Sequence, residues 1–325
     1  MPDRTQRPTP HPTVSPAGRN LVAFCFPGQG ALEAGMGREL AEAVPAAMEV
    51  YRVGSEASGL DLRKLCFDSP LEDLVDTEVQ QPALVATCLA MLAAVRERGL
   101  EPDVVVGHSV GEFSALAAVS ALGTGEAIGL VRERGLAMAE AARRHPGSMA
   151  AILGLEDEAV EGLCNRIEGV WAANYNCPGQ IVISGENDAV EECCAEAESL
   201  GARRAIKLKV SGAFHSPLVA RAADRFKPAI DAIRFHEPVP PFMSTVTAGI
   251  EPASRLASLL VEQLTSPVKF TQAARGLIAG GVTTFVEVGP GSVLSGLVKR
   301  IDKSVRAISI NDVASLDKAQ EALAR

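Results

Sequence analysis

The chain has 325 residues, of which 47% are hydrophobic and 22% charged, and its formal net charge is −9. This length and composition predict a folded protein with a large core and room for a second, smaller domain. The negative charge argues against general nucleic-acid binding, because contacts to phosphates need a positive field. The seven cysteines contain no CxxC spacing. We therefore expect neither a disulfide framework nor a zinc site, and a reducing cytoplasm as the location.

The N-terminus and the longest apolar run bear on targeting. The first twenty residues contain five prolines, three arginines and no apolar segment, which argues against a secretory signal. We expect a disordered tail over 1–20, with a transit peptide as the less favoured alternative. No apolar run reaches the length of a membrane span. The longest, Pro82 to Val95, contains Thr87 and is interpreted as a buried helix.

Alternating strands and helices are predicted from the first apolar run onward. Leu21–Phe26 is typical of a buried strand, and the turn-forming Pro27-Gly28-Gln29-Gly30 ends it. The same reasoning then predicts, in chain order, a helix from about Arg38, a helix over Pro82–Arg98, a strand over 103–107, and helices over Gly111–Leu122 and Gly125–Arg144. This order is typical of a mostly parallel sheet covered by helices.

The order of elements changes after Pro146. The next stretch predicts, in order, a strand over Met149–Leu155, a helix over Asp157–Ile167, strands over Val170–Tyr175 and Gln180–Ser184, a helix over Asp188–Leu200 and a strand over Arg204–Val210. This β-α-β-β-α-β order is that of a ferredoxin-like unit. The larger pattern then resumes with helices near 217–233 and 253–265, a strand over Thr284–Val288 and a helix opening at Pro290.

The sequence therefore predicts an α/β fold in two parts. A small ferredoxin-like domain over 147–210 is inserted into a large domain formed by 21–146 and 211–325. A cleft between two such domains is the default place for a ligand.

Gly107-His108-Ser109-Val110-Gly111 is the most informative motif, because it lies between a predicted strand and a predicted helix. A strand that turns sharply into a helix holds a serine hydroxyl exposed at the strand's carboxyl end. Glycines two residues before and two after the serine leave room for that turn. This context favours Ser109 as a nucleophile over an incidental serine in a tight turn. A serine hydroxyl also needs a base that accepts its proton.

His215 is the candidate base among the five histidines. His11 falls in the predicted tail, His108 belongs to the turn itself, and His145 and His236 sit near prolines at the ends of elements. His215 follows the predicted small domain, where a loop facing the cleft belongs. The alternative is a loop histidine bonded to the backbone.

Six short motifs are informative together. They are Phe26-Pro27-Gly28-Gln29-Gly30, Gly107-His108-Ser109-Val110-Gly111-Glu112, Arg134-Gly135, Asn176-Cys177-Pro178-Gly179-Gln180, Ala213-Phe214-His215-Ser216 and Glu287-Val288-Gly289-Pro290-Gly291. In order and approximate spacing they resemble those of malonyl-CoA:acyl carrier protein transacylases, over roughly residues 21 to 310. The resemblance implies an α/β-hydrolase-like large domain with a ferredoxin-like insertion, which agrees with the order of elements above.

The resemblance also implies catalytic roles. Ser109 would be the acylated nucleophile, His215 its general base, and Gln263 the residue whose main-chain carbonyl holds the histidine. The backbone N–H groups of Gln29 and Val110 would form the oxyanion hole, where one such donor is typically worth ~3 kcal/mol. The spacing alone predicts that Gln263 is a solvated glutamine on a helix. It also predicts that the segment around Gln29 is an ordinary turn after a strand.

Arg134 is implied to bind the free carboxylate of malonate. A planar guanidinium takes a carboxylate through two parallel hydrogen bonds. Arg132 lies two positions away on the same predicted helix and faces roughly the opposite direction, so only one of the two can reach the cleft. The alternative is an exposed Arg134 paired with Glu133 or Glu140.

Two further residues are implied to contact substrate. Phe214 would favour unbranched malonyl, because its ring fills the volume that an α-substituent needs, although it could equally pack the loop. Asn176 is expected near the site in a binding or structural role. One departure from the family is Ala31-Leu32 after Gly30, where relatives often have Ser-Gln. This difference affects the side chains that are expected to line the pocket beside Gln29.

The resemblance implies a coenzyme A thioester and an acyl carrier protein as partners. Carrier proteins are usually acidic, so an acidic enzyme needs a local basic patch, and solvated charges are the alternative. Two groups of cations qualify: Arg203, Arg204, Lys207 and Lys209 on the small domain, and Lys299, Arg300 and Lys303 on the large one. We expect a cytoplasmic monomer that uses no metal, redox cofactor, nucleic acid or membrane, the phosphopantetheine being carried by the partner.

The expected activity is malonyl transfer from malonyl-CoA to a carrier-protein thiol through an acyl-serine. The alternatives are a hydrolase, or a transferase of other acyl groups, acting on carrier proteins, and a catalytically silent docking subunit. A carboxylate clamp favours transfer over hydrolysis, and intact Ser109, His215 and Arg134 argue against a silent subunit. The motifs do not distinguish fatty-acid from polyketide synthesis.

Overall fold

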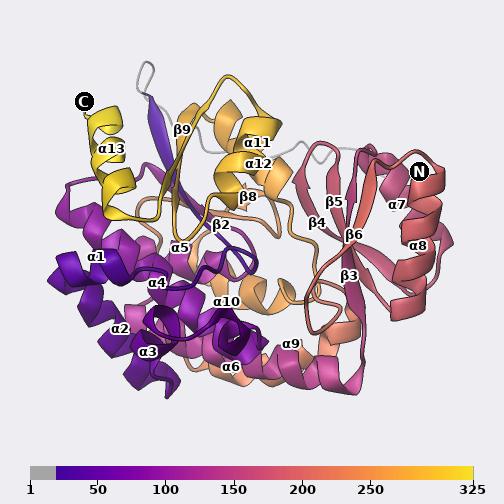
Figure 1. Ribbon diagram of the computed structural model, residues 1–325, viewed down its shortest axis with the longest axis horizontal. Helices are drawn as coiled ribbons and strands as arrows, with labels where there is room; N and C mark the ends of the chain where they lie inside the picture. The colour runs from indigo at the N-terminus through magenta and orange to yellow at the C-terminus, as the bar shows by residue number, and fades with distance from the viewer. Residues whose placement is uncertain (1–19, 325) are drawn as a thin grey trace, which may run out of the picture.

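The computed structural model describes residues 20–324, so the tail expected over 1–20, with His11, lies outside the described residues apart from Asn20. Figure 1 shows two sheets, a larger one surrounded by most of the helices and a smaller one at the right of the view. The larger sheet has six strands in the order β10-β9-β1-β2-β7-β8, and the smaller has four in the order β4-β5-β3-β6. The predicted mixed α/β class is confirmed.

The larger sheet is parallel except at one edge. Neighbouring strands from β10 to β7 pair in parallel, and β8 is antiparallel to β7. β1 and β2 are buried along their whole length, as expected of apolar runs in a sheet covered on both faces. The strands of this sheet are β1 (Leu21–Phe26), β2 (Val104–Gly107), β7 (Phe242–Ser244), β8 (Gly249–Ile250), β9 (Val282–Val288) and β10 (Arg306–Ile310).

Helices pack on both faces of this sheet. Alternate residues of β1 belong to different apolar clusters: Phe24 packs with the cluster that contains most of α2, α4 and α6, and Ala23 with that of α11 and α12. The helices around this sheet are α1 (Arg38–Ala43), α2 (Pro45–Ser58), α3 (Leu62–Phe67), α4 (Thr77–Glu97), α5 (Gly111–Ala118), α6 (Thr124–Arg144), α9 (Ala220–Asp231), α10 (Ala253–Glu262), α11 (Phe270–Ala279), α12 (Val293–Ile301) and α13 (Val313–Leu323), with 3-10 turns η1 (Leu71–Leu74) and η2 (Pro217–Val219).

The smaller sheet is antiparallel throughout. One face packs against its two helices through residues such as Ile152 and Ile183, while the other face contributes Ala151 and Val182 to the main core. This alternation follows the two-residue period of a strand. Its elements are β3 (Ser148–Leu153), α7 (Asp157–Arg166), β4 (Val170–Cys177), β5 (Gln180–Gly185), α8 (Asn187–Ser199) and β6 (Arg204–Lys207).

Some boundaries differ from the predicted ones. α4 begins at Thr77 rather than Pro82, so the proline lies inside the helix, where burial of the whole segment outweighs the missing backbone donor. The helix predicted to Leu122 ends at Ala118, the strand predicted to Val210 ends at Lys207, the segment near 217–233 divides into η2 and α9, and the helix predicted from Pro290 begins at Val293. The sequence patterns did not predict α2, α3, α11, α13, β7, β8 or β10. β7 and β8 are too short to show a period.

Helix α4 has the length and apolar composition that could cross a membrane, which corrects the prediction that no run reaches that length. It is the one such helix between residues 20 and 324, and 78% of its most apolar window is buried inside the protein. Such burial is what a core helix needs. Its interior position between α2 and α6 agrees with the predicted role of Pro82–Val95 as a buried helix.

The approach of α5 to β1 gives a prediction about Gly111. An added Cβ there would lie 2.2 Å from the carbonyl oxygen of Phe26, which is backbone and cannot move aside. Gly111→Ala should therefore lower the free energy of unfolding by ~1–3 kcal/mol or more, as measured by urea denaturation. In the control Gly129→Ala, on α6, the nearest atom would be 3.6 Å away. That helical substitution should be neutral or stabilising by up to about 1 kcal/mol. Equal stabilities for the two variants would contradict this account.

Candidate active site

Ser109 lies in a strained turn between β2 and α5. Its φ is 52°, in the left-handed region that non-glycine residues rarely adopt. An added Cβ at Gly107 would lie 2.2 Å from the backbone nitrogen of Glu112, so the turn needs glycine there. The amide of His108 donates to the carbonyl of Phe26 at 3.0 Å, which places the ends of β1 and β2 side by side. The turn thus has the geometry of a nucleophile elbow.

His215 faces the Ser109 hydroxyl. Its Nε2 is 2.7 Å from the serine Oγ, and its Nδ1 is 2.9 Å from the main-chain oxygen of Gln263 and 3.2 Å from that of Ser266. A carbonyl oxygen only accepts, so Nδ1 carries the proton and Nε2 is free to accept from the serine. Burial, together with the positive charge of Arg134, lowers the pKa of His215 to about 3. The imidazole is therefore neutral at physiological pH, as a general base must be.

Gln263 is a buried residue at the end of α10, in contrast to the solvated glutamine that its spacing suggests. Its side-chain nitrogen donates to the main-chain oxygen of Ser109 at 3.0 Å. Its main chain thus contacts His215 and its side chain the elbow.

Arg134 is completely buried, at 0% exposure. Its Nη1 donates to Gln81 Oε1 at 2.8 Å, and its Nη2 to Gln263 Oε1 at 3.0 Å and to Ser109 Oγ at 3.3 Å. Its Nε has no acceptor among the described residues. Burial lowers the pKa of the guanidinium to about 10, so it keeps its charge at neutral pH.

The exposed ion pair that was the alternative for Arg134 does not form. No carboxylate within the described part of the chain makes a salt bridge with Arg134, and Glu140 pairs instead with Arg144 and Arg225. Arg132 points elsewhere and donates to the main-chain oxygen of Glu78 at 2.6 Å. An anionic group that reached Ser109 would therefore meet a guanidinium with no carboxylate in contact with it among residues 20–324.

Gln29 lies in the turn after β1, and Val110 is the residue after Ser109. Within residues 20–324, the backbone N–H of neither residue donates to another protein group. The Gln29 side chain donates to Gln80 at the start of α4, which anchors the turn. Backbone donors of this kind are what an oxyanion hole requires.

Asn176 and Phe214 have different surroundings. Asn176, on β4, has its Oδ1 2.9 Å from Nε2 of His108, the residue before Ser109. Burial lowers the pKa of His108, so its neutral ring donates to the amide oxygen. Phe214 is 3% exposed and packs in the main core directly before His215. Its packing is established, and its effect on the choice of acyl group stays a prediction.

Sequence reasoning gave no role to several residues at the site. Gln81 holds Arg134, Ser266 holds His215, and Glu112 accepts from Gln263 Nε2 at 2.6 Å. Glu112 belongs to the elbow motif given above. Its position in the first turn of the helix predicts only a favourable interaction with the helix dipole. Gln81 and Ser266 carry no local signal.

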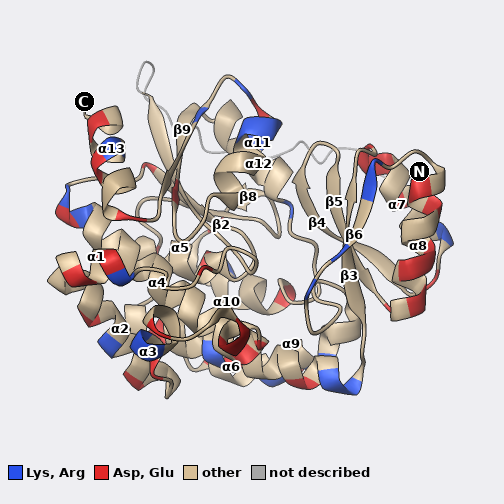
Figure 2. Ribbon diagram, viewed as in Figure 1, with Lys and Arg blue, Asp and Glu red and all other residues tan. Residues whose placement is uncertain are grey.

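The two basic groups lie on different parts of the protein (Figure 2). Lys207 on β6 is exposed and pairs with Glu191 at 2.8 Å. Arg300 on α12 donates to the side chain of Gln180 at 2.7 Å and to the main-chain oxygen of Pro178 at 3.3 Å, which ties the larger sheet to the turn between β4 and β5. Within the described residues, no three His, Cys, Asp or Glu side chains are grouped as metal ligands.

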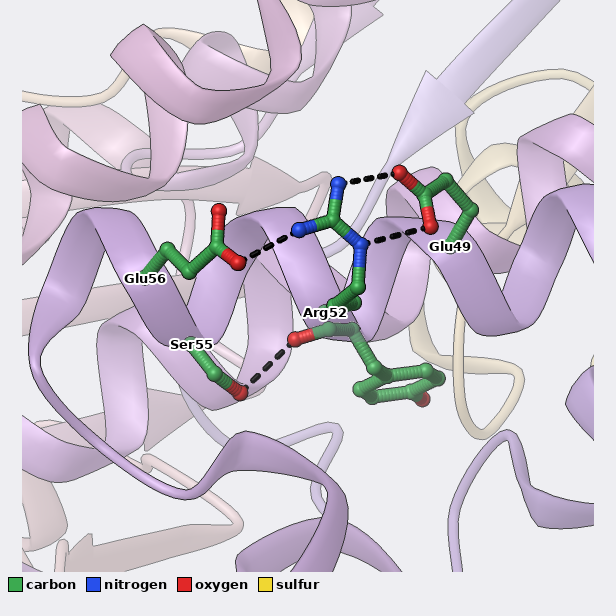
Figure 3. Close-up of polar contacts among 5 residues, drawn as sticks. Glu49, Arg52, Ser55 and Glu56 are labelled. Carbon is green, nitrogen blue, oxygen red and sulfur yellow. Dashed lines mark hydrogen bonds and ion pairs between the residues drawn. The ribbon is translucent and has the colours of Figure 1, made fainter.

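A separate hollow of about 850 Å³ lies over α1, α2 and α3 and includes none of these residues. At its rim, Arg52 pairs with Glu49 and Glu56 along α2 (Figure 3). Exposed pairs of this kind contribute little to stability, because solvent screens them. The chemistry of Ser109 is not part of this hollow.

Comparisons with known proteins agree on one family. Residues 23–324 match the acyl transferase domain family. A malonyl CoA-acyl carrier protein transacylase from Bacillus subtilis is 44% identical over 307 residues, covering 93% of this chain and 97% of the relative. The enzyme of that name from Haemophilus influenzae is 39% identical over 307 residues, covering 93% of this chain and 98% of the relative.

Solved structures give the same result. A crystal structure named MCAT, from Streptococcus pneumoniae, superposes with a TM-score of 0.89 at 38% identity, covering 93% of this chain and 100% of that one. A malonyl-transacylase in complex with its type II polyketide synthase acyl-carrier protein superposes with a TM-score of 0.90 at 37% identity, covering 93% of this chain and 100% of that one.

The positive φ of Ser109 gives a stability prediction. A left-handed conformation costs an L-residue roughly 1–2 kcal/mol, and glycine avoids this cost. Part of that advantage is offset because glycine makes the unfolded chain more flexible. Ser109→Gly should therefore be more stable than Ser109→Ala by up to about 1 kcal/mol in urea denaturation. At Ser114, inside α5, the alanine variant should instead be more stable than the glycine variant, because glycine is the poorer helix former. A glycine variant at 109 that is less stable than the alanine variant would contradict the strain.

Proposed function

The chain belongs to the acyl transferase family, with relatives named malonyl CoA-acyl carrier protein transacylases, and we propose that it transfers malonyl from malonyl-CoA to a carrier-protein phosphopantetheine thiol. The observation that carries this proposal is a buried Arg134 without a carboxylate partner in the described chain, 3.3 Å from the hydroxyl of Ser109. An acyl group on Ser109 with a free carboxylate fits that charge.

Acyl transfer proceeds in two half-reactions. Ser109 Oγ attacks the thioester carbon of malonyl-CoA while Nε2 of His215 takes the hydroxyl proton. The amides of Gln29 and Val110 bind the oxyanion of the tetrahedral intermediate. When the C–S bond breaks, coenzyme A leaves with the proton from His215. The carrier-protein thiol then attacks the acyl-serine, His215 accepts the thiol proton, and Ser109 leaves with it.

The main-chain carbonyls of Gln263 and Ser266 orient the histidine in both half-reactions. A proton on Nδ1 donates to these oxygens, so Nε2 keeps its direction toward Ser109. Phe214 and Asn176 complete the proposed binding residues. Asn176 acts through His108, and Phe214 through the volume it fills beside the base.

We infer the finer fold and the setting in the same way. The strand orders of the two sheets support an α/β-hydrolase-like domain over 21–146 and 211–325 with a ferredoxin-like insertion over 147–210. The proposed residues all come from one chain, so a monomer suffices. Acyl exchange between serine and thiols needs neither metal nor redox cofactor. Acyl-CoA and carrier proteins as substrates suit a cytoplasmic enzyme.

Intact-mass analysis tests the acyl-serine. After incubation with a panel of acyl-CoAs, the wild type should gain the mass of one malonyl group and lose it when holo carrier protein is added. Ser109→Ala should gain none, because the hydroxyl is required for the covalent step. An acyl adduct on Ser109→Ala would contradict the assignment of Ser109 as the acylated residue. Loss of the adduct to water before carrier protein is added would favour a hydrolase.

Arg134 should determine the preference for malonyl over acetyl. Without the guanidinium the malonyl carboxylate is desolvated and unpaired, whereas an acetyl methyl group is unaffected. A charge-assisted pair is worth ~1.5–3 kcal/mol, so Arg134→Ala should lower the ratio of kcat/KM for malonyl-CoA to that for acetyl-CoA by roughly 10–150-fold. Arg134→Lys should recover part of this, since an ammonium restores charge without the two-pronged geometry.

The matched control is Arg132→Ala on the same helix. Its side chain bonds a main-chain oxygen of α4, so its removal should affect both substrates alike. Thermal unfolding of each variant separates loss of fold from loss of recognition. Equal losses for malonyl and acetyl in Arg134→Ala would remove Arg134 from substrate binding.

A further inference from the structure

Glu112 is a buried acid that the mechanism above does not use. It lies in the first turn of α5 at 0% exposure. Its Oε1 accepts from Thr245 N at 2.6 Å, from Thr245 Oγ1 at 2.8 Å and from Ser244 Oγ at 3.3 Å. Its Oε2 accepts from Gln263 Nε2 at 2.6 Å. A carboxyl group is retained in a core only where such donors are present.

The Gln263 amide joins this acid to the buried guanidinium. Its nitrogen faces Glu112, and its oxygen accepts from Arg134 Nη2 at 3.0 Å. Burial raises the pKa of Glu112 to about 7. In its ionised form the carboxylate only accepts, and a guanidinium only donates, so the amide has one orientation that satisfies both. Glu112, together with the main-chain oxygen of Ser109, therefore determines which atom of Gln263 faces Arg134.

The guanidinium is held by two glutamine oxygens. Gln81 contacts Nη1, and Gln263 contacts Nη2, the same nitrogen that reaches Ser109. Without the Gln263 contact, one firm side-chain bond remains, about which the group can turn. A carboxylate on Ser109 needs the plane of the guanidinium fixed, because two-pronged binding depends on direction as well as distance.

We propose that Glu112 is a positioning residue for acyl-group selection, which acts through the Gln263 amide to aim Arg134 at the carboxylate of the bound acyl group. The inference rests on the proposed function, since it needs an acyl group with a free carboxylate. Thr245, at the end of β7, fixes the acid in turn. The chain of contacts therefore links β7 to Arg134 on α6 through α5 and α10.

The isosteric variant Glu112→Gln tests this. The new amide carries an NH₂ group in place of one carboxylate oxygen. In one orientation this group faces the N–H of Thr245, and in the other it faces Nε2 of Gln263, so a donor meets a donor in both. Turning the Gln263 amide over removes that conflict and brings its nitrogen against Arg134, but it also breaks the bond from Gln263 Nε2 to the main-chain oxygen of Ser109. The lost contact to Ser109 affects both substrates, so the test is the ratio of kcat/KM for malonyl-CoA to that for acetyl-CoA, which we expect to fall roughly 10-fold or more, mainly through KM for malonyl-CoA.

Two controls separate positioning from mere stability. Glu287→Gln changes another buried acid, which accepts from the amides of Leu294 and Ser295 at the start of α12 and bonds no site residue. It should lower the melting temperature and leave the malonyl-to-acetyl ratio unchanged. In an Arg134→Ala background, Glu112→Gln should have no further effect on the ratio, because the residue through which it acts is gone.

The outcomes are distinct. Equal loss for both substrates in Glu112→Gln, or a ratio change that persists without Arg134, overturns the inference. If Glu112→Gln does not fold, Thr245→Val removes one donor and leaves the acid in place. The ratio should then fall by about two-fold or more, and an unchanged ratio overturns the inference. A wild type that forms no malonyl adduct overturns the proposed function and this inference with it, whereas failure in the variants alone leaves that function intact.

Discussion

A buried positive charge without a carboxylate beside it is the constraint on which the rest of the site depends. Removing an ion from water costs several kcal/mol even after relaxation, so Arg134 needs oxygen partners from the surrounding protein. They come from different elements: Gln81 on α4, Ser109 before α5 and Gln263 at the end of α10. Each partner is neutral. The guanidinium is therefore held by neutral dipoles, and the carboxyl group of Glu112 lies beyond the Gln263 amide rather than in contact with Arg134.

The same charge acts on the base. Together with burial it lowers the pKa of His215 to about 3, which keeps the imidazole neutral before the reaction. Main-chain carbonyls of Gln263 and Ser266, rather than an aspartate, hold the histidine. An aspartate there would place a negative charge close to Arg134. Neutral carbonyls orient the ring without adding such a charge.

Local patterns predicted the parts of the site that depend on local geometry. The glycine spacing around Ser109 predicted the elbow, because a sharp strand-to-helix turn excludes a Cβ at Gly107. Elimination among five histidines led to His215. Gln263 came only from the family resemblance, since its spacing suggested a solvated position. Its contacts depend on how α10 meets the elbow, which no periodicity within the helix reports.

The same limit explains what was not predicted in the fold. β7 has three residues, too few for a period, yet it continues into Thr245, which binds Glu112. The early start of α4 places Gln81 in a helix, where it meets Arg134. Both depend on packing between segments far apart in sequence, and propensity is a weak guide there. The residues hardest to predict are therefore those that hold the recognised ones in place.

The smaller sheet shares backbone contacts with the segment that positions the base. Val268 pairs with β4 through bonds of 2.8 Å to Tyr175 and Ala173, only two residues after Ser266, whose carbonyl faces His215. From β4, Asn176 also bonds His108, which precedes Ser109. A shift of this sheet would thus move both the carbonyl that orients the base and the ring next to Ser109. The smaller sheet is therefore connected, through its backbone and through Asn176, to the residues around Ser109 and His215.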